Sequence, residues 1–287
     1  EGLAAAGQPA EARRVLGRLA NPSSRLLVQT QVAVDLADID PKASARFLAE
    51  AEALTAGIAD PDDRVQALGW VGAAFAEIGD SDTAQAVAAR LITVGAAADA
   101  TSAALTGIAS ALGETGQGTL ASLMLDAAEG QAILIGDAKD RASALQSVAW
   151  NRTERSQYAE AERVAMGIDD EFYRGIALQD LGVALAESGA AAEAQRIAAV
   201  LRGPAGSDFQ QKDGPYEIAK TLAGEGEVAA AEAVAESIVE PDWRAQALAE
   251  VAEALAGSHP SDAERIGRRV EDAGWRSVVL AAVAAGL

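Results

Sequence analysis

The feature of this sequence that most constrains its fold is an internal repeat. Three segments share one pattern, an Arg followed by Ala-Leu, a set of apolar residues and a turn: DDRVQALGWVGAAFAEIGD (62–80), EFYRGIALQDLGVALAESG (171–189) and PDWRAQALAEVAEALAGSH (241–259). The apolar residues recur three, four and seven places apart, which places them on one face of an amphipathic helix. A chain built from such units stacks each unit on its neighbour, so that the apolar faces are buried between them.

A second set of repeated positions follows the first helix of each unit and is rich in glycine. Its members are Gly7, Asp40, Gly79, Gly116, Gly189 and Gly226, with Ser156 and His259 in the same place in two further units. Glycine just past a helix end can take a positive φ and close the last turn, and His is among the residue types enriched in that left-handed region. We therefore expect positive φ at Gly79, Gly116 and Gly189, and the same turn role for Ser156 and His259.

A third set of positions precedes each unit, as in ADPDDR (59–64) and VEPDWR (239–244). Asp or Asn can cap free N–H groups at a helix start, and Pro needs no donor there. This predicts that first helices begin near residues 22, 61 and 241, and that each unit reads first helix, Gly turn, second helix, Asp-Pro turn.

One arginine position recurs at intervals of 32 to 40 residues, at Arg25, Arg64, Thr101, Arg141, Arg174, Gln211, Arg244 and Arg276. Acids stand beside it in the Asp-Pro turns. We expect Arg64, Arg141, Arg174 and Arg244 to form ion pairs with carboxylates in the same or the preceding turn. The alternative is a basic strip for an anionic ligand.

These units resemble the tetratricopeptide repeat family. The family frame Trp-x-x-Leu-Gly-x-x-Tyr is matched by Leu68, Val71, Gly72 and Phe75, again by Leu178, Leu181, Gly182 and Leu185, and by Leu105, Ile108, Ala109 and Leu112. The closing Pro is matched by Pro22, Pro61 and Pro241. The resemblance covers the whole chain and implies an all-α, right-handed α-solenoid of antiparallel helix pairs. We expect about seven to eight repeats and about fifteen helices in a single domain over residues 1–287. Because the family's large aromatics are mostly Leu and Ala here, a HEAT-like array stays open as the alternative subclass.

The amino-acid composition argues against several classes of function. The chain carries 43 acids against 23 bases, a net charge of −20. Such a surface repels phosphate backbones and anionic lipid, so we expect neither a nucleic-acid nor a membrane partner. There is no Cys and a single His, His259, so no cofactor, metal or catalytic set can be assembled. The stretch 113–118 lacks the Gly-Lys-Ser/Thr ending of a phosphate loop. We therefore predict that the chain is not an enzyme.

Three further expectations concern the origin of the chain. The bias to Ala and Arg over Lys is typical of a GC-rich bacterial gene, and the lack of Cys and of a signal-like start fits the cytoplasm. The chain begins and ends within first helices, which favours a segment of a longer multidomain protein.

The family frame also projects residues onto the concave groove, namely Gln66, Gln146, Trp150, Gln179 and Glu253. A column of acids stands near the ends of the first helices, at Asp38, Glu77, Glu114, Glu154 and Glu187. Because a carboxylate there opposes the helix dipole, the column needs a reason. Solubility and turn chemistry are one explanation, and an acidic rim for basic partner segments is the other. The candidate partner-binding residues are therefore Asp38, Glu77, Glu114, Gln146, Trp150, Glu154, Gln179 and Glu187.

One unit, residues 141–166, departs from the frame, because Arg152 stands where other units have Leu or Phe. The leading functional hypothesis is a scaffold or sensor module that binds a protein or peptide in the concave groove of the array. The alternative is a self-association module that regulates an attached effector domain, and an α/α-toroid enzyme is the weakest of the three. The sequence leaves the partner, the pathway and the oligomeric state open.

Overall fold

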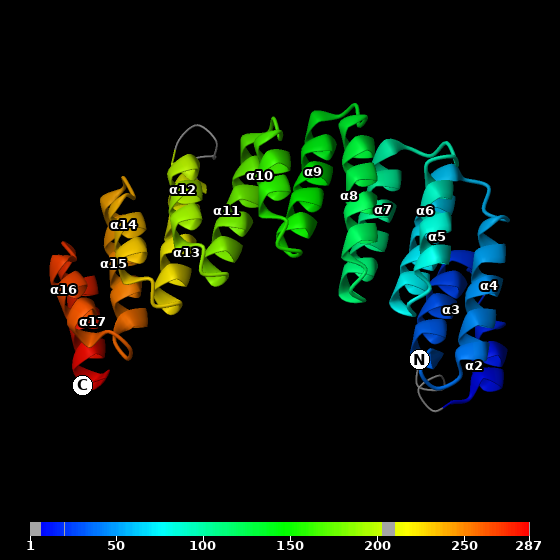
Figure 1. Cartoon of the computed structure of the whole chain (residues 1–287), viewed down its shortest axis with the longest axis horizontal. Coiled ribbons are helices and arrows are strands. Elements are labelled where there is room, and N and C mark those ends of the chain that lie inside the picture. Colours follow the sequence, from blue (N-terminus) through cyan, green and yellow to red (C-terminus); the bar gives the residue numbers. More distant parts are fainter. Residues whose placement is uncertain (1–6, 20, 203–209, 287) are drawn as a thin grey trace. The chain divides into compact units, whose positions relative to one another are not determined.

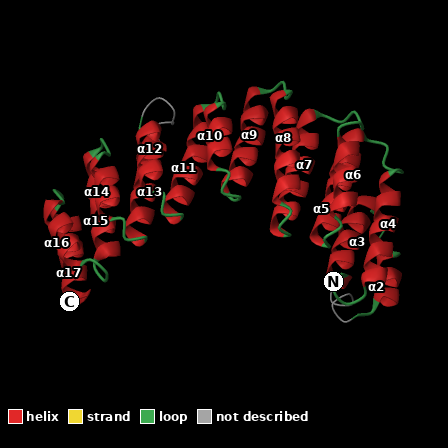
Figure 2. Ribbon diagram, viewed as in Figure 1, coloured by secondary structure: helices red, strands yellow, loops and turns green. Residues whose placement is uncertain are grey.

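The computed structural model describes residues 7–19, 21–202 and 210–286, and every regular element in these ranges is a helix (Figures 1 and 2). This confirms the all-helical prediction. The chain divides into two compact units, Glu1–Asn151 and Arg152–Leu287.

The first unit contains α2 (Pro9–Leu16), α3 (Pro22–Leu36), α4 (Pro41–Thr55), α5 (Pro61–Glu77), α6 (Ser81–Leu91), α7 (Ala98–Glu114), α8 (Gly118–Ile133) and most of α9 (Ala138–Thr153). The second unit contains α10 (Tyr158–Met166), α11 (Glu171–Glu187), α12 (Ala191–Leu201), α13 (Gln210–Gly224), α14 (Val228–Glu236), α15 (Pro241–Leu255), α16 (Pro260–Arg269) and α17 (Ala273–Gly286).

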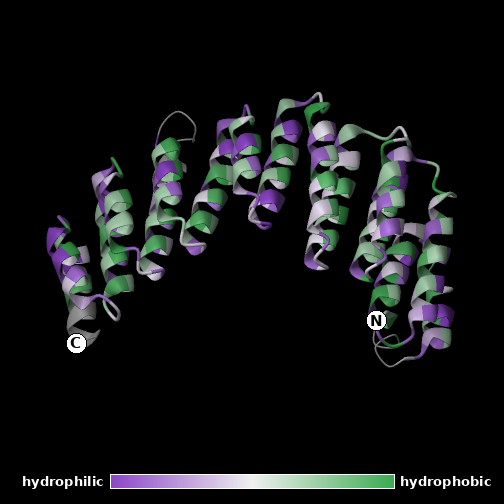
Figure 3. Cartoon of the chain, in the orientation of Figure 1, coloured by the Kyte–Doolittle hydropathy of each residue, from purple (hydrophilic) through white to green (hydrophobic). Residues whose placement is uncertain are grey.

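Helices pack in neighbouring pairs, and first helices also pack on first helices. In the first unit α3 contacts α5 and α5 contacts α7, while each also contacts the helix that follows it. In the second unit α11, α13, α15 and α17 contact one another in the same succession. Apolar and polar residues alternate around these helices (Figure 3), so each helix has an apolar side to bury.

Helix starts follow the Asp-Pro prediction. Pro22, Pro61 and Pro241 are the first residues of α3, α5 and α15. The Asp60 carboxylate accepts hydrogen bonds from the backbone N–H groups of Asp62 at 3.0 Å and Asp63 at 3.1 Å. The capping side chain thus satisfies two N–H groups that have no partner within the helix.

The glycine turns are also confirmed. Gly79, Gly116 and Gly189 have φ of +81°, +78° and +79°. Ser156, which occupies the same place without being glycine, has φ of +55°.

Two members of the predicted turn set are wrong. His259 has φ of −134° and Asp40 has φ of −142°, and each is the residue before a helix, α16 and α4 respectively. The physical reason is the proline that follows each of them, which disfavours the α region for the preceding residue, and ψ is 61° at His259 and 80° at Asp40. Both residues therefore mark helix starts, not left-handed turns.

Close approach of first helices depends on small residues. A Cβ on Gly72 of α5 would lie 2.5 Å from Ile108 Cδ1 of α7, and a Cβ on Gly182 of α11 would also clash with Ile218 of α13. These glycines are the Gly of the repeat frame. Their lack of a side chain makes room for the isoleucine of the next first helix.

The recurrent arginines bind main-chain oxygen. Five of them donate to the carbonyl of the residue six places earlier: Arg64 to Ile58, Arg141 to Ile135, Arg174 to Ile168, Arg244 to Ile238 and Arg276 to Val270. For Arg64 the predicted carboxylate partner is wrong, and for Arg244 the carboxylate is Glu271, 3.9 Å away in the following turn. These carbonyls lie one to three residues past the end of the preceding helix, and the guanidinium gives them a donor. The side chain of Gln211 lies outside the described residues.

Ion pairs link second helices instead. Arg13 pairs with Glu50, Arg90 with Glu52, Arg196 with Glu162, and Arg265 with Glu232. The partners stand 33 to 38 residues apart in the sequence, about one repeat. These exposed pairs join successive second helices within a unit.

Candidate partner-binding groove

A hollow of about 350 Å³ lies between α5 and α7 in the first unit. Its lining on α5 includes Asp62, Asp63, Gln66, Gly69, Trp70 and Ala73. Its lining on α7 is Ala100, Ala103, Ala104 and Gly107, all small residues.

A second hollow, of about 560 Å³, lies between α7 and α9. Ala100 and Ala103 line this hollow as well, so the two hollows adjoin along α7. On α9 it is lined by Asp140, Ser143, Ala144, Ser147, Trp150 and Asn151. We call the combined depression the α7 groove, and all its lining residues belong to the first unit.

The floor of the α7 groove is nearly flat because its residues are small. A Cβ on Gly69 would lie 2.8 Å from the Cβ of Ala104, so α5 and α7 are in close contact there. Farther along α7, a Cβ on Gly107 would meet no other atom within 4 Å. The floor is therefore closely packed at Gly69, whereas the space above Gly107 is open.

Two tryptophans stand on the flanks of the α7 groove. Trp70 projects from α5 and is half-buried, while Trp150 projects from α9 and is 44% exposed. A large indole that remains this exposed beside small residues offers apolar area to an incoming chain.

Every charged residue that lines the α7 groove is acidic. Asp62, Asp63, Asp99 and Asp140 lie in the first turns of α5, α7 and α9, where the helix dipole favours negative charge. The Asp62 carboxylate accepts a hydrogen bond of 2.7 Å from the backbone N–H of Ala97. This bond ties the start of α7 to the start of α5.

Three hydroxyl groups in the α7 groove are already engaged, and that of Ser102 donates to the carbonyl of Ala128 at 2.9 Å. Thr106 donates to the carbonyl of Ser102 at 2.9 Å, and Ser147 donates to the carbonyl of Ser143 at 3.1 Å. These last two bonds turn their hydroxyls back onto their own helices. The α7 groove therefore presents mainly apolar surface between acidic ends.

The predicted acidic column does stand at the ends of first helices. Glu77, Glu114 and Glu187 are the last residues of α5, α7 and α11. Asp38 follows α3, and Glu154 follows α9. Three of these acids belong to the first unit and two to the second, so a common rim of all five stays a prediction.

Within the first unit two acids of the column lie close together. Burial raises the pKa of Glu77, and the negative charge of Glu114 raises it further. Glu77 is one turn beyond Ala73 on α5, and Glu114 is two turns beyond Gly107 on α7. The far end of the α7 groove is therefore acidic too.

The remaining predicted residues have different places. Gln146 is half-buried on α9 and is not among the residues that line the α7 groove. In the second unit, Gln179 of α11 donates a 3.3 Å hydrogen bond to Asp213 of α13.

Glu154 lies near Asp180, whose pKa is raised to about 6 by burial and then by the Glu154 charge. Arg152 is 2% exposed, so it does occupy an apolar position of the repeat frame.

Sequence reasoning missed Trp70. A signal was present, because Gln66 and Trp70 stand in QALGW while Gln146 and Trp150 stand in QSVAW. Both pairs are spaced one helical turn apart, so each Trp shares a helix face with a residue already projected onto the groove.

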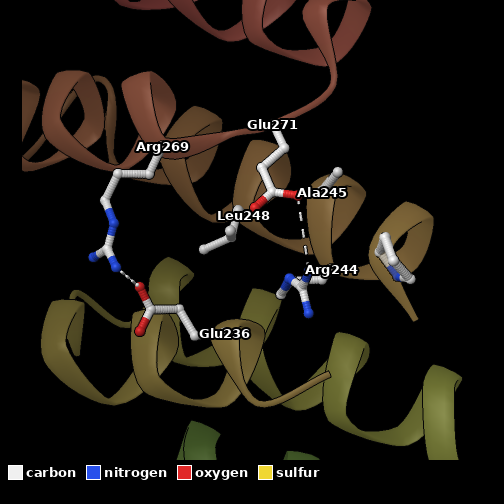
Figure 4. Close-up of a pocket in the computed structure, with 7 residues that line it drawn as sticks. Glu236, Arg244, Ala245, Leu248, Arg269 and Glu271 are labelled. Atoms are coloured by element: carbon white, nitrogen blue, oxygen red, sulfur yellow. Dashed lines mark ion pairs between the residues drawn. The ribbon is translucent and has the colours of Figure 1, made fainter. Parts of the chain in front are cut away.

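The second unit has a hollow of a different kind, about 320 Å³, beside α15 (Figure 4). Its arginines face carboxylates: Arg269 lies 2.5 Å from Glu236, and Arg244 lies 3.9 Å from Glu271. Because each arginine in this hollow faces a carboxylate, the hollow favours neither a positively nor a negatively charged ligand.

Two kinds of feature are absent from the residues that the structure describes. No group of three or more His, Asp or Glu side chains there is arranged to hold a metal ion. No helix in the described ranges has the length and apolar character needed to cross a bilayer.

Comparison with known proteins leaves the family open. No family model matches the chain, and no curated protein matches it. Among solved structures, the crystal structure of Ton1535 from Thermococcus onnurineus NA1 aligns with 96% of this chain and 84% of that chain, at 15% identity and a TM-score of 0.41.

Proposed function

We propose that this chain is a tetratricopeptide-like α-solenoid that binds a protein or peptide segment, and that the α7 groove receives a basic segment of that partner. The observation that carries the proposal is the lining of the groove. It combines two tryptophans and a floor of Ala and Gly with charged residues that are all carboxylates.

The charge of the partner follows from this lining. Lys and Arg side chains would meet Asp62, Asp63, Asp99 and Asp140 at one end of the α7 groove. The net charge of −20 would also speed the approach of a basic segment, and salt would weaken the effect. Trp150 would supply the large buried contact that interfaces usually need.

A displayed library of random peptides, selected on the whole chain, tests the proposal. Selected peptides should be rich in Lys and Arg, and Trp150→Ala should weaken their binding by about tenfold or more. Trp275→Ala is the matched control, because Trp275 is 38% exposed on α17 in the second unit. Equal binding to wild type and Trp150→Ala, or selection of acidic peptides, would contradict the proposal.

A further inference from the structure

We infer that the occupant of the α7 groove is an amphipathic α-helix, with large apolar side chains along one face and basic residues toward both ends. This inference rests on the function proposed above and specifies the conformation and chemistry of the partner. Four features of the first unit support it.

The first feature is the spacing of the floor residues. Ala100, Ala103, Ala104 and Gly107 stand at i, i+3, i+4 and i+7 on α7, so they form one straight stripe along that helix. Ala103 and Gly107 are exposed, and the space above Gly107 is open. Small residues at this spacing let a partner helix approach α7 closely at Ala103 and Gly107, whereas an extended chain needs no such spacing.

The second feature is the width between the tryptophans. Packed neighbouring helices lie roughly 8–10 Å apart, so α5 and α9 on the two sides of α7 are separated by roughly 16–20 Å. A partner helix that lies over α7, about 10–12 Å across with its side chains, is wide enough to contact side chains on both flanking helices, among them Trp70 and Trp150. A single extended strand is narrower, so it covers less of the distance between the two tryptophans.

The third feature is the space over the stripe. The two hollows measure about 350 and 560 Å³ and their floor contributes little more than methyl groups and bare backbone. Because closely packed interfaces leave few voids, side chains of the partner must fill the two hollows. Leu, Ile, Met or Phe side chains of the partner would fill the space and gain the most from leaving water.

The fourth feature is the position of the charges. Asp62, Asp63, Asp99 and Asp140 lie at the beginning of the helices that form the α7 groove. Glu77 and Glu114 lie at the other end, where α5 and α7 finish. The stretch between them is one 17-residue helix, which is about 25 Å long. A partner helix of similar length would place Lys or Arg near each end and keep its centre apolar.

The experiment uses the full chain and, as its probe, the tightest peptide selected from a displayed library of random 18-residue sequences. Gly107→Leu places a side chain in the open space over the floor, where a Cβ meets no other atom. Gly130→Leu is the matched control, since Gly130 is an exposed glycine in α8 with equally open surroundings and lies outside the α7 groove. We expect Gly107→Leu to weaken binding of the probe at least tenfold and Gly130→Leu to change it less than twofold.

Two readouts on the peptide test its conformation. Circular dichroism of the mixture, minus that of the separate components, should show added helix. Replacement of a central peptide residue by Pro should weaken binding at least tenfold, because Pro breaks a helix interior. Replacement of the first residue by Pro should be tolerated.

The outcomes separate this inference from the proposed function. A basic peptide that needs Trp150 but binds without added helix, and tolerates the central Pro, would overturn the helical occupant and leave the groove function standing. Peptides whose binding is insensitive to Trp150→Ala would overturn both.

Discussion

The guanidinium of Arg64 donates two hydrogen bonds to the main-chain carbonyl of Ile58, from Nε at 2.8 Å and from Nη2 at 2.6 Å. The same six-residue link recurs at four other arginines along the chain. It joins the start of a first helix to the turn before it. In these five repeats the recurrent Arg is therefore explained by a turn carbonyl that needs a donor.

Replacing Arg64 by Met should test this link. The Met side chain keeps much of the apolar stem but cannot donate, so the Ile58 carbonyl loses both bonds. We expect a loss of about 1.5–3 kcal/mol in the free energy of unfolding, as for hydrogen bonds that involve a charged group. Urea unfolding would measure it. Arg196→Met is the control, because its exposed pair with Glu162 should contribute no more than about 1 kcal/mol. Equal losses in the two variants would contradict the special role of Arg64.

Two helical glycines should respond to the same substitution with opposite sign. Gly69→Ala forces a methyl to within 2.8 Å of the Ala104 Cβ, which has no rotamer to move into, so α5 and α7 must separate. We expect it to lower the free energy of unfolding by about 1–3 kcal/mol. Gly107→Ala meets no atom within 4 Å and should raise it by about 0.5–1 kcal/mol, since Ala is the better helix former. Thermal unfolding of both variants beside wild type would decide, and destabilisation by Gly107→Ala would show that the α7 surface is not open.

The left-handed turns can be tested by substitutions in both directions, from Ser to Gly at one turn and from Gly to Ser at another. Ser156 holds φ of +55° in a place that other repeats give to glycine. A non-glycine residue in this region costs about 1–2 kcal/mol, which exceeds the roughly 0.5–1 kcal/mol of chain entropy that glycine adds. Ser156→Gly should therefore stabilise the chain by about 0.5 kcal/mol, and Gly116→Ser should destabilise it. If chemical denaturation found both changes neutral, φ at these turns would not be the controlling factor.

The carboxyl of Asp180 should make stability depend on pH. Burial, with the Glu154 charge as a second cause, raises its pKa from 3.8 to about 6. Between about pH 4 and 6 the folded chain then holds this proton while the unfolded chain has lost it. The free energy of unfolding contributed by this group therefore falls as pH rises through that window. Asp180→Asn should remove the dependence and stabilise the chain at pH 7.

Two measurements check the Asp180 prediction. Urea unfolding at several pH values should show a shallower fall for Asp180→Asn than for wild type. Carboxyl NMR should place the midpoint of Asp180 near 6 in wild type and lower in Glu154→Gln. A wild-type midpoint near 3.8 would contradict the prediction.

The sequence predicted much of this fold because its repeats carry local chemistry. Pro61 and Gly79 act through their own backbone dihedral angles, so their roles could be inferred without knowing any neighbour. His259 was misassigned because the alignment placed it in the turn set, although Pro260 decides its backbone. The sequence could not show that Arg64 binds a main-chain carbonyl and not a carboxylate, since sequence spacing does not show which oxygen lies within reach.

The candidate site was harder to predict than the fold. Trp150 follows from the family frame, and Trp70 shares a face with Gln66, but only the contact of α5 with α7 at Gly69 and Ala104 shows that Trp70 borders a hollow. The depth of a hollow depends on the distance between helices that are far apart in the sequence. Periodicity gives the face of a helix, but it does not give that distance.

The packing pattern has a consequence for how the chain forms. Within each unit, packed helices are neighbours in the chain or have a single helix between them, as α5 and α7 do. A helix that leaves the ribosome thus meets all its packing partners within about one further repeat. Chains with contacts this local fold quickly, and they can do so from the first repeat onward while synthesis continues.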